Sequence, residues 1–229
     1  MPKKQQNLIF RLVCRYLLFA SLSPVLLMNA ISSAQAEIIT ALNFTGGSSL
    51  TPALVARTWG YVFDVTSPVS VAGLSFYDNG GDGLNFSHAV GLWNSSSKLL
   101  ASRTIDSGTV DPLDPSGKFR YKLLDSILSL PVATGYRVAG FYDTNNTDLA
   151  IRQVTSITTA SGISYVTGAY IPSVALSFPS TNESAGALLG GSFVLSGNAP
   201  PLPEPGTLTL LLLGSVIGFA KRRKTPDSH

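Results

Sequence analysis

The sequence predicts an all-β fold: an antiparallel β-sandwich of the jelly-roll or immunoglobulin-like kind, flanked by an N-terminal signal peptide and a short C-terminal transmembrane helix. Three observations predict it. Short apolar segments alternate with polar or small residues at a period of two, and turn-forming residues bound them. No long segment repeats at the helical period, and alternating strand and helix units are absent. Both ends of the chain carry an apolar stretch beside basic residues.

The first 36 residues have the three-part layout of a secretory signal peptide. Basic residues come first, at Lys3, Lys4, Arg11 and Arg15, and the apolar stretch 16–28 follows. Ala34-Gln35-Ala36 then matches the cleavage site of signal peptidase. The alternative is an uncleaved membrane anchor, but the apolar stretch is short and contains Pro24. We expect the export machinery to recognise 1–36 and the mature chain to begin at Glu37.

The exported domain is expected to cover 37–197, and its strands follow from alternation between turns. The segments predicted as strands are 61–65, 69–77, 89–93, 99–105, 119–123, 136–142, 164–167 and 191–195. The pair 89–93 and 99–105 reads as a hairpin, because Asn94 and three serines separate the two segments. Strands of this length with regular turns predict a β-sandwich.

Charge and cysteine content exclude several kinds of site. The formal net charge of +3 is misleading, because eight of the 16 basic residues lie in the two ends of the chain. Residues 37–202 carry eleven acidic residues, which leaves that part near −3 and predicts no nucleic-acid partner. The single cysteine, Cys14, lies in the predicted signal peptide. Disulfides and thiolate chemistry are therefore not expected in the mature chain.

Candidate catalytic groups are few. His88 is the only histidine of the exported domain, and no G-x-S-x-G motif accompanies it. Zinc needs three or four protein ligands of the His or Cys kind, which one histidine cannot supply. We expect His88 to be structural and the protein not to be an enzyme, and no cofactor is predicted apart from the calcium considered next.

Two loops rich in Asp and Asn are candidates for calcium. Ca²⁺ takes six to eight oxygen ligands, and exported β-domains use it for rigidity. The candidate ligands are Asp78, Asp82, Asp143, Asn145 and Asp148. The EF-hand spacing is not completed, because Ala89 stands where the final Glu would be. The alternative is that these residues only form turns.

Aromatic rings offer a candidate ligand surface. Trp59 lies near a predicted strand start and Trp93 at a predicted strand end, so either ring is a candidate for stacking on a sugar. The alternative is that both belong to the core.

The C-terminal end has a second three-part layout. A Pro-rich linker, 198–202, precedes Pro203-Glu204-Pro205, and a predicted transmembrane segment, 207–220, is followed by Lys221, Arg222, Arg223 and Lys224. The apolar run 208–220 would cover about 20 Å as a helix, against roughly 30 Å of hydrocarbon. It can insert if the bilayer thins, with the basic cluster on the cytoplasmic side.

This tail, 203–229, resembles the PEP-CTERM sorting signal of exported proteins in Gram-negative bacteria that possess an exosortase. The resemblance implies that Pro203, Glu204 and Pro205 are recognised by that membrane enzyme and that the four basic residues stop the segment in the membrane. It further implies transient membrane anchoring, then a place at the cell surface or outside it, often among exopolysaccharide. The five residues after the basic cluster make the tail slightly longer than the family's pattern.

A second resemblance covers roughly 57–143. Its motifs are Leu74-Ser75-Phe76-Tyr77, His88 to Trp93, Leu99-Leu100-Ala101, Pro131-Val132 and Gly135 to Val138. These look like an uncharacterised β-sandwich family of bacterial surface and secreted proteins. The resemblance implies the sandwich fold and a binding or structural role, with no chemistry to carry over.

Taken together, the sequence predicts a non-catalytic exported surface or matrix protein, sorted through an exosortase-type pathway and associated with exopolysaccharide or biofilm. One alternative is a carbohydrate-binding module, with or without calcium. The other is an enzyme of unrecognised type, which single substitutions of His88 or the aspartates would reveal.

Overall fold

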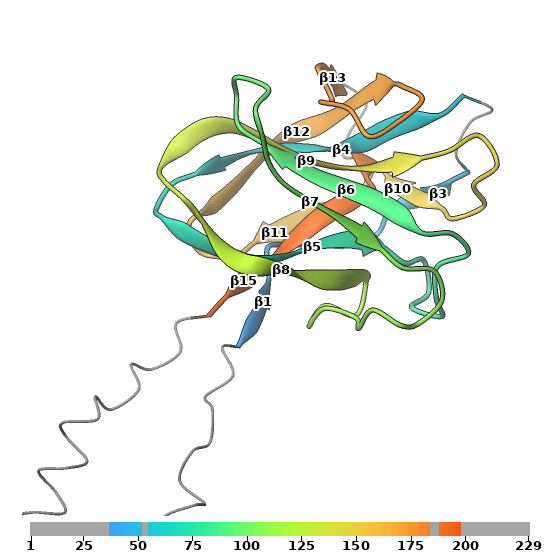
Figure 1. Cartoon of the computed structure of the whole chain (residues 1–229), viewed down its shortest axis with the longest axis horizontal. Helices are drawn as coiled ribbons and strands as arrows, with labels where there is room; N and C mark the ends of the chain where they lie inside the picture. The colour runs from blue at the N-terminus through green and yellow to red at the C-terminus, as the bar shows by residue number, and fades with distance from the viewer. Residues whose placement is uncertain (1–36, 52–54, 184–187, 198–229) are drawn as a thin grey trace, which may run out of the picture. The chain divides into compact units, whose positions relative to one another are not determined.

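The computed structural model describes residues 37–51, 55–183 and 188–197 (Figure 1). The predicted signal peptide, linker and sorting tail lie outside the described residues. The described part is all-β and its strand pairs are antiparallel, which is consistent with the predicted sandwich. Across these ranges, no helix is long and apolar enough to cross a membrane.

Two large sheets form the body of the domain. The four-stranded sheet has the order β1-β15-β5-β8, and its strands are β1 (Ile38–Thr40), β15 (Gly191–Ser196), β5 (Val69–Tyr77) and β8 (Phe119–Leu130). The six-stranded sheet has the order β13-β12-β4-β9-β6-β7, and its strands are β13 (Thr181–Glu183), β12 (Ile163–Pro172), β4 (Arg57–Val65), β9 (Ala133–Tyr142), β6 (His88–Trp93) and β7 (Leu99–Ile105).

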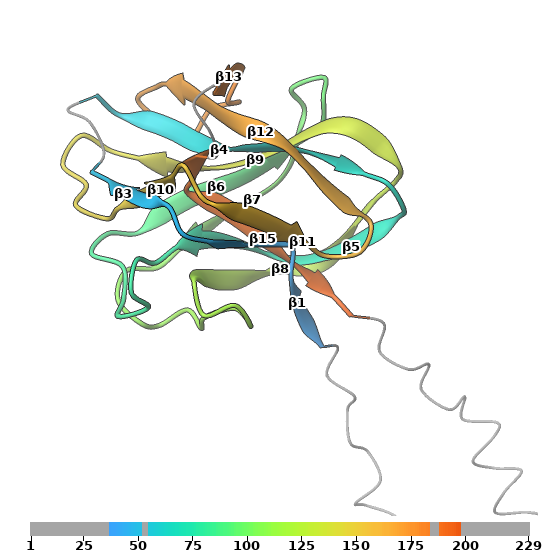
Figure 2. The same cartoon turned by 180° about the vertical axis from the view of Figure 1, so that it is seen from behind.

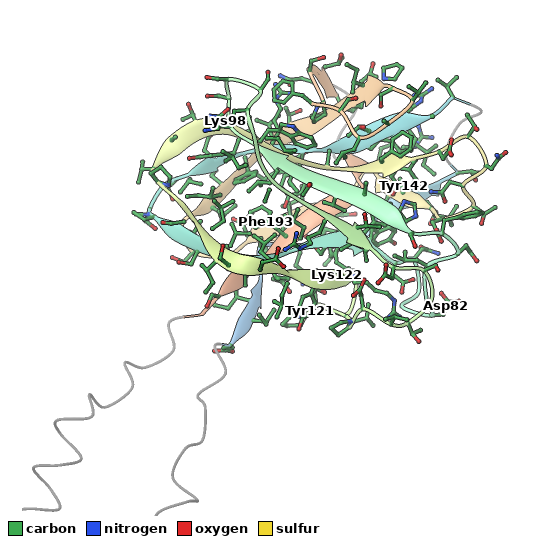
Figure 3. The ribbon with its side chains drawn as sticks, viewed as in Figure 1. Asp82, Lys98, Tyr121, Lys122, Tyr142 and Phe193 are labelled. Atoms are coloured by element: carbon green, nitrogen blue, oxygen red, sulfur yellow. The ribbon has the colours of Figure 1, made fainter. Side chains whose placement is uncertain are left out.

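The core lies between these two sheets (Figure 1). Alternate residues of each strand point inward, because side chains change face at every residue. Phe63 of β4 meets Phe193 of β15 with ring centroids 4.9 Å apart, and the hydroxyl of Tyr61 lies 3.0 Å from that of Ser192. Phe193 lies in the interior in Figure 3. Aromatic burial on this scale supplies much of the apolar area that stabilises a fold of this kind.

Two small sheets complete the domain, and Figure 2 shows their strands β3, β10 and β11. Their strands are β2 (Leu42–Thr45) with β11 (Ser156–Thr159), and β3 (Ser48–Leu50) with β10 (Ala150–Arg152) and β14 (Leu188–Leu189). Strand β1 runs into β2 through a bend at Ala41. The amide of Ala41 donates to Phe193 O at 3.3 Å, while its carbonyl accepts from Ala160 N at 3.0 Å. One chain segment therefore joins two sheets.

Every strand predicted from alternation is present, and several are longer than predicted. The predicted segment 119–123 is the first part of β8, which continues to Leu130. The second part was not predicted because the ladder is irregular between the two parts. Leu123 pairs with Gly73 but Leu128 pairs with Val71, so the residues between them bulge out of the ladder. A bulge breaks the period of two, and alternation therefore could not predict the extension.

A loop covers the outer face of the six-stranded sheet. We call residues 173–180 the strap. The hydroxyl of Thr58 holds it, because the amide of Ser177 donates to Thr58 Oγ1 at 3.1 Å and the hydroxyl of Ser173 lies 3.1 Å away. Arg137 donates from Nη1 to Pro179 O. The strap acts as an additional layer over this face.

The two ends of the described domain lie side by side. Strand β1 pairs with β15, and beyond that pair the amide of Gly197 donates to the carbonyl of Glu37 at 2.6 Å. The chain therefore enters and leaves the domain at one place.

Candidate functional site

A buried polar cluster lies under the loops that follow β5 and β9. His88 begins β6 and stacks on Phe76 of the facing sheet, with ring centroids 3.6 Å apart and planes 12° apart. Its Nδ1 lies 2.9 Å from Phe141 O, and its Nε2 lies 2.9 Å from Asp148 Oδ2. The side-chain nitrogen of Asn146 also lies 3.3 Å from Nδ1 and 3.2 Å from Nε2. Each ring nitrogen of His88 is therefore engaged by buried neighbours.

Asp148 connects two loops. Besides His88, it accepts hydrogen bonds from the amide of Asn85 at 2.8 Å and the amide of Phe86 at 2.9 Å. Burial raises the pKa of the Asp148 carboxyl, but the hydrogen bonds from His88 and from these two amides lower it, and the net result is below the ordinary value. The charged carboxylate thus fixes the backbone at Asn85 and Phe86.

A second buried ion pair supports the same end of the domain. The Arg120 guanidinium donates to Asp78 Oδ2 at 2.7 Å and to the carbonyls of Asp111 and Gly81, both at 2.8 Å. Asp78 also accepts from the amide of Gly83 at 3.0 Å. Both charged side chains are buried. The loop after β5 is therefore held by an internal cation.

The five candidate calcium ligands are not brought together. Asp78 is bonded to Arg120 and Asp148 to His88. Asp143 accepts from the amide and hydroxyl of Thr144, as in a turn, while Asp82 and Asn145 are exposed. Over the ranges that the structure covers, there is no group of three or more His, Cys, Asp or Glu side chains placed to hold a metal. Calcium binding stays a prediction, and two of its five proposed ligands, Asp78 and Asp148, are already bonded to Arg120 and His88.

Trp59 and Trp93, the candidate rings for stacking on a sugar, are both buried. Trp59 is 2% exposed and packs on Tyr142, with ring centroids 5.3 Å apart. Trp93 is 4% exposed because it lies between Gly91 and the strap. A Cβ added at Gly91 would lie 2.4 Å from an atom of the Trp93 ring, so the ring lies directly against Gly91. Phe178 of the strap meets the indole edge-on, with ring centroids 6.3 Å apart. Neither indole presents a face to a ligand in this structure.

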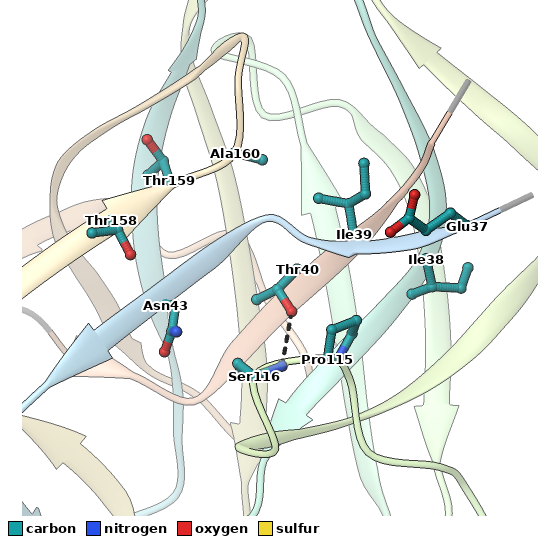
Figure 4. A pocket seen from close by; sticks show the side chains of 10 residues that line it. All are labelled: Glu37, Ile38, Ile39, Thr40, Asn43, Pro115, Ser116, Thr158, Thr159 and Ala160. Carbon is teal, nitrogen blue, oxygen red and sulfur yellow. Dashed lines mark hydrogen bonds between the residues drawn. The ribbon is translucent and has the colours of Figure 1, made fainter. Parts of the chain in front are cut away.

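Two grooves are present on the described surface. The larger, of about 350 Å³, lies at the free edge of β1, where Thr40 accepts a hydrogen bond from the amide of Ser116 (Figure 4). Its walls include Ile38, Ile39 and Thr159. The smaller, of about 230 Å³, lies between β7 and β8. Arg103 crosses this region, donating to Leu123 O at 3.1 Å and pairing with Asp125 at 2.6 Å.

One exposed aromatic side chain was not selected from the sequence. Phe86 is 43% exposed although its own amide is fixed by the buried Asp148. An Asn-Phe-Ser run inside a loop carries no periodicity, so the sequence does not show which way the ring points. The contact between the Asn85 amide and Asp148, 63 residues apart, fixes the backbone next to it.

Comparison with known proteins gives no relative. The chain matches no protein-family model, no curated protein and no solved structure.

Proposed function

We propose that this chain is a non-catalytic exported protein of the cell surface or extracellular matrix, sorted through an exosortase-type pathway and associated with exopolysaccharide or biofilm. The proposal rests on the two ends of the sequence: the signal-peptide pattern up to Ala36 and the PEP-CTERM-like tail from Pro203. The domain between them would be carried by the sorting tail as cargo.

One structural observation supports this arrangement. Glu37 and Gly197 are hydrogen-bonded neighbours, so cleavage before Glu37 and attachment after Gly197 would occur at the same point of the domain. A domain with adjacent ends can be held from one side while its remaining surface faces outward. The engaged ring nitrogens of His88 support the non-catalytic part of the proposal.

We also infer the finer architecture. To compare the strand order with that of known folds, we number eight strands from 1 to 8 in chain order: β1, β4, β5, β6, β7, β8, β9 and β15. The four-stranded sheet then reads 1-8-3-6, and the six-stranded sheet contains 2-7-4-5. This is the strand order of a jelly roll, with β12 and β13 added beyond β4. Jelly rolls are common among exported and carbohydrate-recognising domains.

The test is the intact mass of the protein from its native host, with and without the exosortase. The proposal is supported if the mass corresponds to a chain from Glu37 to near Pro203 only when the enzyme is present. If the mass in both strains still includes Lys221 to His229, the tail is not processed. That result contradicts sorting and indicates a membrane anchor that is not cleaved. Retention of residues 1–36 contradicts cleavage of the signal peptide.

A further inference from the structure

Five Asn-x-Ser/Thr triplets in the domain match the acceptor pattern of N-linked glycosylation. The pattern combines an asparagine, whose side-chain nitrogen receives the sugar, with a hydroxyl two residues later. A transferase has to take the triplet into its own site, which is easier for a surface loop than for a paired strand. The five triplets begin at Asn43, Asn85, Asn94, Asn145 and Asn182.

Two of these asparagines are bound by other parts of the fold. Nδ2 of Asn85, the atom that a sugar would join, donates to Asp148 Oδ1 at 3.0 Å. Asn43 lies in β2, where it pairs with β11, and its Oδ1 accepts from Lys118 Nζ at 2.7 Å. Modification at either position would compete with contacts that the domain already makes.

Two further triplets are held by local structure. Asn94 closes the turn between β6 and β7, because its Oδ1 accepts hydrogen bonds from two amides of that turn at 3.1 Å and 3.0 Å. Asn182 is exposed but belongs to β13, where it pairs with Ala169 of β12. Its triplet ends at Ser184, outside the described residues. A transferase would have to break the turn or the strand pairing to bind these segments.

The triplet Asn145-Asn146-Thr147 lies in the loop that joins β9 to β10 (Figure 1). Its middle residue, Asn146, is buried, with Nδ2 3.2 Å from His88 Nε2 and with Oδ1 accepting from the amide of Asp148 at 2.7 Å. The residues on either side of Asn146 are exposed. The Asn145 side chain makes no hydrogen bond to another residue that the structure describes. The asparagine and the hydroxyl residue of the pattern are therefore both accessible, while the residue between them anchors the loop.

A charge also distinguishes this triplet. Asp143 stands two residues before Asn145, and none of the other four asparagines has an acidic residue in that position. The Asp143 side chain is exposed. Its carboxylate offers a transferase an ionic contact beside the acceptor nitrogen.

We propose that Asn145 is an N-glycosylation site. In the reaction, Asn145 Nδ2 forms a bond to the anomeric carbon of a glycosyl diphosphate donor. The bond from that carbon to the diphosphate oxygen breaks, the diphosphate leaves with the electron pair, and one proton of Nδ2 passes to a base of the transferase. This inference rests on the proposed export, because the transferase would act on the chain outside the cytoplasm. In Figure 1 the loop lies away from β1 and β15, so a glycan there would leave both chain ends free.

The experiment is peptide mass spectrometry of the mature protein purified from its native host. Trypsin cleaves after Arg137 and Arg152, and no Lys or Arg lies between them, so Asn145 is released in the peptide 138–152 without any other of the five triplets. We expect this peptide to be heavier than its sequence and its fragments to place the added sugar on Asn145. Asn145→Gln and Thr147→Val should abolish the added mass, whereas Thr147→Ser, which keeps the hydroxyl, should retain it.

The matched control is Asn182→Gln, which changes another exposed asparagine of the same pattern and should leave the mass of 138–152 unaltered. Added mass that survives in Asn145→Gln would place the sugar on a threonine hydroxyl and overturn the asparagine site. Sugar on the other triplets, with 138–152 unmodified, would overturn the choice of this loop.

The same measurement separates the modification from the export on which it rests. An unmodified peptide 138–152 in a chain that begins at Glu37 overturns the glycosylation site and leaves the proposed export intact. An unmodified peptide in a chain that retains residues 1–36 overturns both. Sugar on Asn145 in a chain that begins at Glu37 supports both.

Discussion

Asp148 accepts hydrogen bonds from a side chain and two backbone amides in a buried site, so its removal affects several groups at once. Asp148→Ala leaves Nε2 of His88 and the amides of Asn85 and Phe86 without this acceptor. Each buried donor left without a partner costs about 1 to 3 kcal/mol in the free energy of unfolding. Urea denaturation measures the change. The matched control is Asp125→Ala, because Asp125 pairs with Arg103 but is 96% exposed. We expect no measurable shift there, and equal shifts in the two variants would contradict a structural role for the buried pair.

The same carboxylate predicts a dependence of stability on pH. The pKa of Asp148 is lower in the folded protein than its ordinary value of 3.8. A lowered folded-state pKa stabilises the protein above the ordinary value, and this contribution is lost as the pH falls through the folded-state pKa. The urea midpoint of the wild type should therefore fall between about pH 6 and about pH 3 by more than that of Asp148→Asn. Parallel pH profiles for the two proteins would show that Asp148 is not responsible.

At the scale of elements, Thr58 of β4 is one of two side chains that bond the strap, the other being Arg137 of β9. Thr58→Val keeps the shape of the residue but removes the hydroxyl that accepts from Ser177 N. We expect a loss of about 1 to 3 kcal/mol, the cost of leaving a buried polar group without a partner. In a Trp59→Phe background, acrylamide should quench the Trp93 fluorescence more strongly, because Phe178 no longer covers the ring. Thr104→Val, on the exposed side of β7, serves as the control. Unchanged quenching in Thr58→Val would mean that other contacts hold the strap.

The elements also show how far alternation predicts a fold of this kind. The long strands β5 and β7 were predicted with their full bounds, β5 from its alternation and β7 as the second strand of a hairpin that follows Asn94 and three serines. Strands β2 and β11 were missed. Each has four residues, and their pairing joins Leu42 to Thr159, a contact that no local pattern records. The buried cluster around His88 could likewise be predicted only in part from local sequence. Asp148 was selected for its loop composition, but its partner His88 lies 60 residues away.

At the scale of the whole molecule, the strand order makes closure of the four-stranded sheet depend on its last strand in the sequence. Strand β15 is the last described strand, yet it lies between β1 and β5 inside the four-stranded sheet. Its Phe193 and Val194 are fully buried. The sheet therefore cannot close until β15 is available, and if the chain is exported as we propose, it cannot close until Ser196 has crossed the membrane. From Gly197 to Pro203 the chain spans at most about 20 Å when fully extended, so folding would be completed close to the start of the sorting tail.

This order predicts that the domain depends on its final strand. A mature chain that ends at Gly190 lacks β15, which leaves β1 without its partner and exposes the face of β4 that Phe193 covers. We expect this chain to be digested rapidly by a low concentration of protease and to lack a cooperative urea transition, because a sheet that loses an inner strand no longer covers the core. A chain that ends at Gly197 keeps every described strand and should resist the protease as the full mature protein does. If the chain ending at Gly190 also resisted digestion, the sandwich could form before export is complete, and the sorting tail would not need to hold the protein at the membrane while its last strand inserts.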